Sequence, residues 1–199
     1  MSDICVRERM EELFEEHRPD YVFHAAAYKH VPMMEDNPEE SVRNNVDGTR
    51  VIADLAVKYG TRKFVMVSTD KAVNPTNVMG CSKRICEIYV QSLDQAIKDG
   101  KVSGRTQFVT TRFGNVLGSN GSVIPLFKEQ PVQTVDLAER MIRLSGVKGI
   151  EIRFTGLRDG EKLYEEVLNE EETSKPTFHP KIKIAQVRAY DYADANLRI

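Results

Sequence analysis

The chain has 199 residues, enough for one domain or slightly more, and its 41% hydrophobic and 29% charged residues are typical of a globular protein. The 28 basic and 30 acidic residues leave a net charge of −2 without a basic stripe, which argues against nucleic acid as the main partner. The apolar runs are too short to span a membrane and nothing resembles a signal peptide, so we expect a cytoplasmic protein. The three cysteines lack metal-ligand spacing and are expected to be free thiols.

Helical and strand patterns alternate over the first 119 residues. We predict helices at 6–17, 38–59 and 78–99 and strands at 21–26, 63–67 and 108–113. The second helix has capping signals, with Asn37 as the N-cap, Pro38 at the first helical position and Gly60 after its end. Such alternation predicts an α/β fold, a Rossmann-like doubly wound parallel sheet in which the three strands are neighbours.

The remainder of the chain is more mixed. We predict a helix at 134–144, a strand at 151–155, a helix at 161–168 and a final strand at 181–187. Residues 170–176 have the composition of a solvated loop.

Polar residues directly follow the second predicted strand. The sequence Ser-Thr-Asp-Lys at 68–71 stands where this strand emerges, and the carboxyl ends of parallel strands face the ligand crevice. This position suits chemistry by Asp70 and Lys71, but the pair taken by itself is more simply interpreted as a surface Asp-Lys turn. On the helix that follows, Lys83 lies one turn after Met79 on the same face.

The Met79-x-x-x-Lys83 spacing resembles the Tyr-x-x-x-Lys pair of short-chain dehydrogenase/reductases, with methionine in place of tyrosine. Five segments extend the likeness over nearly the whole chain: HAAAYKHVPMMEDNPEE at 24–40, NNVDGTRVIADLA at 44–56, VSTDKAVNPTNVMGCSK at 67–83, TRFGNVLGSNGSVIPLF at 111–127 and GLRDGEKLYEEVL at 156–168. Together they resemble the nucleotide-sugar 4,6-dehydratases of bacterial polysaccharide biosynthesis, whose best-known substrate is UDP-N-acetylglucosamine.

This resemblance implies a lyase that oxidises a UDP-N-acetylhexosamine at C4, eliminates water across C5 and C6 and reduces C6, for capsule, O-antigen or glycan biosynthesis. The implied cofactor is NAD or NADP, with NAD favoured. By resemblance Asp70 is the acid for the C6 hydroxyl, Lys71 is the C5 base and Thr69 is a substrate-positioning hydroxyl. Met79 cannot deprotonate an alcohol, so the group that takes the C4 hydroxyl proton stays open between Asp70 and a water relay.

The resemblance also assigns binding residues. The implied cofactor contacts are Asp3, Ile4, Ala25, Ala26, Ala27 and Lys83, and the implied substrate contacts are Tyr28, Lys29, His30, Asn115, Arg158 and Glu161. Arg158 would bind the diphosphate and Glu161 the uridine ribose, although Asp159 replaces a proline that is frequent in the family. The ordinary alternatives are helix–strand packing for the three alanines, an exposed helix lysine for Lys83 and N-terminal capping for Glu161.

By the same resemblance, residues 1–119 are the C-terminal portion of an NAD(P)-binding Rossmann domain, and residues 120–199 form a smaller sugar-nucleotide-binding part. No Gly-rich turn precedes residue 21, and a family segment is missing between residues 130 and 131. We therefore expect these residues to belong to a longer protein and to be inactive alone. Relatives can be membrane-anchored by segments outside this chain.

Two other functions stay open. A nucleotide-sugar epimerase shares the fold and cofactor, but the Asp70-Lys71 pair argues against it because 4-epimerisation needs no acid at C6. A fragment that binds a partner or a sugar nucleotide without turnover is the non-enzymatic alternative. We also expect a homodimer or higher homo-oligomer, formed by the helices predicted at 38–59 and 78–99.

Overall fold

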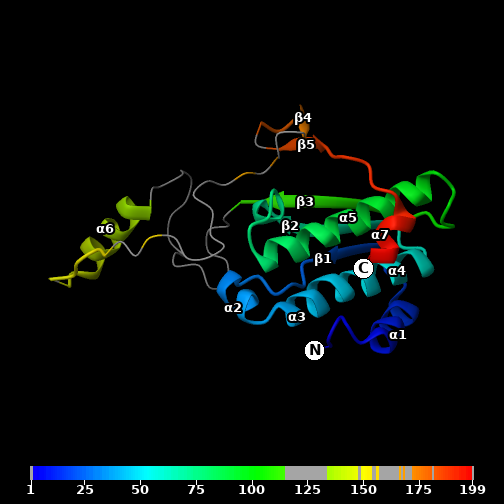
Figure 1. Cartoon of the computed structure of the whole chain (residues 1–199), viewed down its shortest axis with the longest axis horizontal. Coiled ribbons are helices and arrows are strands. Elements are labelled where there is room, and N and C mark those ends of the chain that lie inside the picture. The colour runs from blue at the N-terminus through cyan, green and yellow to red at the C-terminus, as the bar shows by residue number, and fades with distance from the viewer. Residues whose placement is uncertain are drawn as a thin grey trace. The chain divides into compact units, whose positions relative to one another are not determined.

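The computed structural model describes residues 2–114, 134–147, 149–153, 156, 166, 168, 172–180 and 182–198 (Figure 1). The chain divides into two compact units, residues 1–114 with 159–199 and residues 115–158. Among the described residues, no helix is both long enough and apolar enough to cross a membrane.

The first unit is built on a parallel sheet. Its strands are β1 (Tyr21–His24), β2 (Lys63–Thr69) and β3 (Gln107–Phe113), hydrogen-bonded in that order. The three predicted strands are thus neighbours, as expected. β2 continues two residues beyond its predicted end, so that Ser68 and Thr69 belong to the strand and Asp70 begins the next turn.

Helices connect these strands. They are α1 (Arg7–His17), α2 (Val31–Asp36), α3 (Pro38–Ser41), the π-helical segment η1 (Val42–Asp47), α4 (Gly48–Lys58), the 3₁₀ turn η2 (Asp70–Ala72) and α5 (Val78–Lys98). α1 and α5 match the predictions, whereas the single helix predicted over 38–59 is interrupted by η1. In η1, the Asn45 carbonyl accepts the Cys86 thiol at 3.0 Å, so a tertiary contact accompanies the widened turn. The Asn37 amide donates to the Met33 carbonyl instead of capping α3.

The hydrophobic core lies between one face of the sheet and helices α1, α4 and α5. Along β2, Phe64, Met66 and Ser68 alternate onto this face and are buried. Helix α5 lies over β2 and β3, with α4 beside it (Figure 1). Residues on the opposite face are more exposed, and Phe23 is 73% exposed. The helix-covered face therefore continues directly into the end of β2 where the polar residues begin.

A hairpin and a helix form the described C-terminal part of this unit. β4 (Thr173–Pro176) pairs antiparallel with β5 (Lys183–Gln186), and α7 (Tyr192–Arg198) packs on α5, where the Tyr192 and Tyr89 rings lie 6.1 Å apart. β5 falls within the strand predicted at 181–187. Residues 173–176, predicted as a loop, instead form the partner strand, because β5 supplies the hydrogen-bonding edge that a solvated loop lacks.

In the second unit, α6 (Thr134–Ser145) matches the helix predicted at 134–144. Residues 151–153 of the strand predicted at 151–155 are not in a strand, and the rest of that segment lies outside the described residues. The helix predicted at 161–168 also lies outside them, apart from residues 166 and 168. The division into functional parts at residue 119 stays a prediction.

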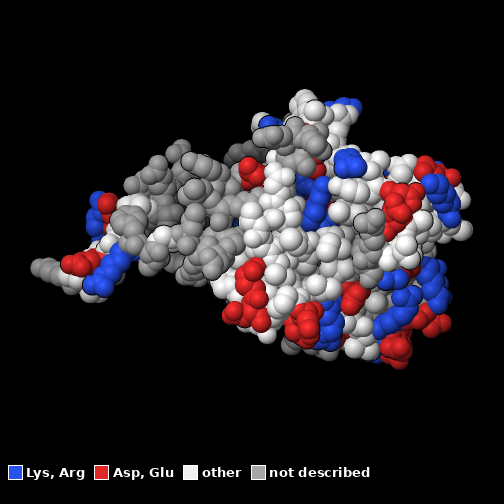
Figure 2. Space-filling view, in the orientation of Figure 1, with Lys and Arg blue, Asp and Glu red and all other residues white. Residues whose placement is uncertain are grey.

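Acidic and basic side chains are interspersed on the face shown in Figure 2. The described part of that face carries no continuous basic stripe, in keeping with the net charge of −2.

Candidate active site

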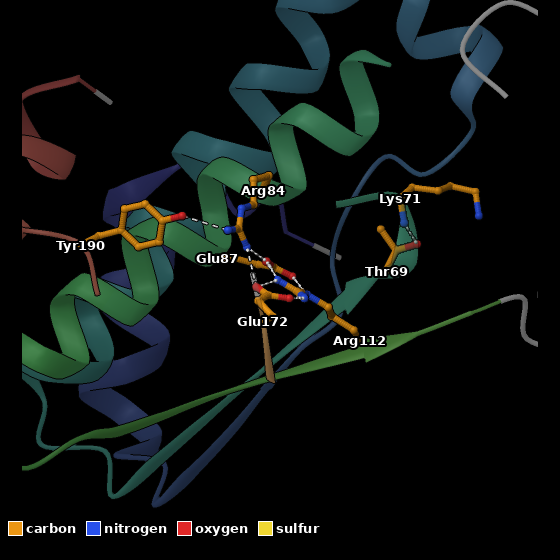
Figure 3. Close-up of polar contacts among 7 residues, drawn as sticks. All are labelled: Thr69, Lys71, Arg84, Glu87, Arg112, Glu172 and Tyr190. Carbon is orange, nitrogen blue, oxygen red and sulfur yellow. Dashed lines mark hydrogen bonds and ion pairs between the residues drawn. The ribbon is translucent and has the colours of Figure 1, made fainter. Parts of the chain in front are cut away.

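The carboxyl end of β2 turns directly into η2, and this turn brings a hydroxyl, a carboxylate and an ammonium group together. Thr69 Oγ1 donates to Asp70 Oδ1 at 2.8 Å, and Lys71 Nζ donates to the same oxygen at 3.2 Å. The backbone N–H of Lys71 donates to Thr69 Oγ1 at 3.3 Å, as Figure 3 shows. The Asp70 side chain is 5% exposed and the Lys71 side chain 32%. A buried carboxylate thus contacts a lysine that reaches solvent, which argues against a plain surface turn.

The first turn of α5 packs closely against η2. The backbone N–H of Gly80 donates to Asn77 Oδ1 at 2.7 Å, which caps the helix. A Cβ atom at Gly80 would clash with the carbonyl oxygen of Lys71, so only glycine permits this approach. Asn77 and Gly80 thus hold Lys71 close to α5, the helix that carries Met79 and Lys83.

Two buried polar groups, Ser68 near the end of β2 and Lys83 on α5, have the chemistry to bind a ribose. Ser68 is 5% exposed, and its Oγ has no hydrogen-bond partner among the described residues. Lys83 is 4% exposed; burial lowers its pKa, while Cys86 and Glu87 act in the opposite direction. Ribose hydroxyls can both donate to and accept from such groups. The two residues therefore fit the nicotinamide ribose of NAD or NADP, and Lys83 is not an exposed helix lysine.

A cavity of about 380 Å³ lies along β1 and brings together three predicted cofactor contacts, Ile4, Ala25 and Ala26. Ala25 and Ala26 are exposed and Ala27 is half-buried, so the chain after β1 is open to a ligand rather than packed under a helix. Asp3 lies at the surface, where its carboxylate accepts the backbone N–H two residues further on at 2.9 Å.

His24, the last residue of β1, is buried beside α4. Its Nε2 lies 2.8 Å from Thr49 Oγ1. Burial, with a smaller contribution from the positive charge of Lys83, lowers the pKa of His24 to about 4. At neutral pH this histidine is therefore uncharged, and its hydrogen bond with Thr49 links β1 to α4.

Asn45 holds the loop that carries the predicted substrate contacts Tyr28, Lys29 and His30, which are all exposed. Asn45 Oδ1 accepts the backbone N–H of Tyr28 at 2.7 Å. Its Nδ2 donates to the Tyr28 carbonyl at 3.0 Å and to Ser82 Oγ at 2.9 Å. Sequence reasoning gave Asn45 no role. The available signal was an asparagine inside a predicted helix, where its side chain can compete for backbone hydrogen bonds.

A buried charge cluster was also missed. It consists of Arg84 and Glu87 on α5, Arg112 on β3, and Glu172 and Tyr190 from the C-terminal part (Figure 3). Burial alone would lower the pKa of Arg112, but hydrogen bonds to Glu87 and Glu172 raise it above its ordinary value. The sequence signal was the presence of opposite charges at core-facing positions of a helix and a strand.

Three predicted substrate contacts, Asn115, Arg158 and Glu161, lie outside the described residues. Their roles stay predictions. Within the described part, the structure brings Thr69, Asp70 and Lys71 together and separately groups Ile4 with the alanines.

The chain is similar to known proteins over most of its length. The family model described as "Polysaccharide biosynthesis protein" matches residues 1–133 and 129–187. The probable polysaccharide biosynthesis protein EpsC of Bacillus subtilis (strain 168) is 42% identical over 235 residues, covering 94% of this chain and 38% of EpsC.

Two other relatives have names that state an activity. A UDP-N-acetylglucosamine 4,6-dehydratase (inverting) of Campylobacter jejuni subsp. jejuni serotype O:23/36 (strain 81-176) is 37% identical over 151 residues, covering 71% of this chain and 44% of the relative. A UDP-glucose 4-epimerase of Rickettsia felis (strain ATCC VR-1525 / URRWXCal2) is 34% identical over 205 residues, covering 80% of this chain and 59% of the relative.

Among solved structures, Pen from Bacillus thuringiensis superposes with a TM-score of 0.74 and 31% sequence identity, covering 85% of this chain and 65% of Pen. The parallel sheet and this likeness establish a Rossmann-like α/β fold. The chain spans about two-fifths of the length of EpsC. Because the family model and EpsC both match most of its residues, the chain belongs to the polysaccharide biosynthesis protein family.

Proposed function

We propose that this chain supplies the catalytic part of an NAD(P)-dependent 4,6-dehydratase that acts on a UDP-N-acetylhexosamine, with UDP-N-acetylglucosamine as the first substrate to test. The observation that carries the proposal is the buried Asp70 carboxylate, bonded to the Thr69 hydroxyl and the Lys71 ammonium group at the end of β2. Similarity to the Campylobacter dehydratase supports this substrate class. Because the chain covers 38% of EpsC, the proposal concerns the complete protein.

Four residues other than Asp70 and Lys71 would hold the cofactor. Lys83 and Ser68 would bind the nicotinamide ribose hydroxyls, and the small side chains of Ala25 and Ala26 would let the cofactor approach the backbone. When bound, NAD or NADP accepts a hydride from C4 of the sugar and returns it to C6. We expect NAD to be the natural cofactor.

Lys71 and Asp70 would divide the elimination between them. After oxidation at C4 has acidified the C5 proton, the neutral form of Lys71 would remove this proton, and the protonated form of Asp70 would donate to the C6 hydroxyl, which leaves as water. The proton held by Lys71 would return to C5 when C6 accepts the hydride. Thr69 would orient Asp70 through its 2.8 Å hydrogen bond. The thioether of Met79 cannot take the C4 hydroxyl proton, so that proton would pass to Asp70 or to a water.

A 4-epimerase is the second candidate, because the Rickettsia epimerase is similar over 80% of the chain. Epimerisation at C4 needs a hydride acceptor and a base for the C4 hydroxyl, but no acid at C6. The Asp70-Lys71 pair therefore favours dehydration.

The test uses the full-length protein with UDP-N-acetylglucosamine and NAD, and separates a 4-keto-6-deoxy product from the C4 epimer by NMR. Asp70→Asn and Lys71→Ala should each lower turnover by about a hundredfold or more while changing nucleotide-sugar binding by only a few fold. Lys101→Ala, which removes a largely exposed lysine, is the matched control. Formation of the epimer alone, or near-normal dehydration by Lys71→Ala, would refute the proposed roles.

We also propose a cytoplasmic homodimer that pairs α4 and α5 with their copies. Exposed apolar side chains on the neighbouring segments, Met33 and Val42, support an interface there. Light scattering at micromolar concentration should give twice the monomer mass, and a monomer would contradict the pairing.

A further inference from the structure

Arg112 is held by two carboxylates at once. Its Nε and Nη2 donate to the two oxygens of Glu87 at 2.9 and 2.7 Å, and its Nη1 and Nη2 donate to the two oxygens of Glu172 at 2.6 and 3.1 Å. The Glu87 side chain is fully buried, and those of Glu172 and Arg112 are 3% and 8% exposed. Two bidentate pairs on one guanidinium group leave little freedom for any of the three side chains.

Arg84 is the second cation of the cluster. Its Nη1 donates to Glu87 at 2.8 Å and lies 3.7 Å from Glu172, and its Nη2 donates to the Tyr190 hydroxyl at 2.9 Å. The two arginines and the two glutamates balance in charge. Loss of the Glu172 charge would take away one of the two carboxylates that these guanidinium groups contact, and arginine cannot relieve this by losing a proton.

Glu172 comes from a part of the chain that otherwise projects into solvent. Directly after it begins the hairpin of β4 and β5, on which Phe178 is 99% and Ile184 58% exposed. At the other end of this segment, the Tyr190 hydroxyl accepts a hydrogen bond from Arg84. The described residues that flank the hairpin, Glu172 before it and Tyr190 after it, thus both belong to the charge cluster.

The cluster lies next to the proposed cofactor contacts. On α5, Arg84 follows Lys83 directly and Glu87 lies one turn later. On β3, Arg112 is the register partner of Ser68. The bonds between Arg112 and Glu87 therefore join the turn of α5 that carries Lys83 to the strand beside Ser68 (Figure 3).

We propose that Glu172 is a positioning residue: by completing the charge balance of this cluster, it couples docking of residues 172–190 to the placement of the Lys83 turn against β3. The coupling does not depend on the proposed reaction. Its consequence, weaker cofactor binding when Glu172 is replaced, rests on the proposed function.

Hydrogen exchange of the full-length protein tests the coupling without any assay of activity. Glu172→Gln keeps the shape of the side chain and removes its charge, and should speed amide exchange by about tenfold or more both in residues 173–190 and around residues 83–87 of α5. Glu40→Gln, which breaks an exposed ion pair with Arg43, is the matched control and should change neither region. Unchanged exchange around residues 83–87 in Glu172→Gln would overturn the proposal.

A charge-balanced double variant separates this role from simple loss of packing. Arg84→Met combined with Glu172→Gln leaves one arginine and one glutamate, so exchange around residues 83–87 should return to within about threefold of wild type although more contacts are lost. Residues 173–190 should stay fast because both of their anchors are gone. A double variant that exchanges faster than Glu172→Gln around residues 83–87 would show that charge balance has no part.

Cofactor titration supplies the last readout. NAD should bind Glu172→Gln about tenfold more weakly than wild type and should recover in the double variant. Equal NAD binding by all three proteins would refute the proposed consequence for the cofactor, and the exchange around residues 83–87 would still decide whether the placement of Lys83 depends on Glu172. If wild type binds neither NAD nor NADP, the proposed function fails, and the exchange experiment still decides the coupling.

Discussion

The strand-end site and the buried charge cluster are both built from ionisable side chains, but in opposite ways. Residues 68–71 are consecutive, and the Lys71 side chain keeps 32% of its surface exposed. In the cluster, Arg112 is 25 residues from Glu87 and 60 from Glu172, and all three side chains are buried. The first arrangement is local and open, whereas the second is long-range and closed.

This difference separates two uses of charge. A group that exchanges protons with a substrate needs access to it, whereas charges that join structural elements need burial and complete pairing. Substitutions in the cluster should therefore reduce stability, and substitutions at the strand end should reduce turnover.

The largest expected effect is on stability. Glu87→Gln removes the carboxylate between Arg84 and Arg112 and should lower the free energy of unfolding of the full-length protein by about 3–5 kcal/mol, because both guanidinium groups stay charged. Urea denaturation measures this, with Glu12→Gln as the control because Glu12 forms an exposed pair with Arg9. Equally small losses of unfolding free energy in both variants would show that the buried cluster contributes no more to stability than an exposed ion pair.

The pH dependence of stability tests His24, a buried group that stays neutral in the folded protein instead of forming an ion pair. His24 has a pKa of about 4 in the folded protein and 6.5 in its ordinary state, so between these values the unfolded chain binds a proton that the folded protein does not. Stability should therefore fall by up to about 3 kcal/mol as the pH drops from 6.5 to 4.

His24→Gln removes this titrating group and should flatten the pH dependence over the same range. Denaturation at several pH values compares the two proteins, with His179→Gln, an exposed histidine, as the control. Parallel pH profiles for wild type and His24→Gln would show that His24 is not the group responsible.

Substitution of Lys71, at the end of β2, should reduce turnover and not stability. Lys71→Ala should lower turnover of the full-length enzyme by about a hundredfold, equivalent to about 2.7 kcal/mol in the barrier, yet leave the urea midpoint nearly unchanged because the side chain is partly exposed. A loss of stability as large as that of Glu87→Gln would mean that the pair is structural.

The smallest effect is expected at Met79, for which the resemblance to short-chain dehydrogenase/reductases implies the position of their tyrosine. Met79→Leu keeps an apolar side chain of similar volume at a site that is 3% exposed, so turnover should change by less than about threefold. A loss comparable to that of Lys71→Ala would show that the thioether itself takes part in the reaction.

Much of the strand-end site followed from sequence because it is local. The chain direction through residues 63–71 places Thr69, Asp70 and Lys71 at the end of a parallel strand, whatever packs around them. The helix predicted over 38–59 is present from Pro38 to Lys58, but its π-helical segment η1 was not predicted, because helix propensity does not register the contacts that Asn45 makes with Tyr28 and Cys86.

The sequence by itself determined the alternation of helices and strands, the neighbourhood of the three parallel strands and the residues at the end of β2, since periodicity and chain order act over short distances. Only the tertiary structure decided the burial of Lys83, the strand at 173–176 and the partners of Arg112. The charge cluster that contains Arg112 joins side chains up to 106 residues apart, as between Arg84 and Tyr190. The physical reason is that a charged group removed from water is stable only next to groups that compensate its charge. The tertiary structure decides which groups these are.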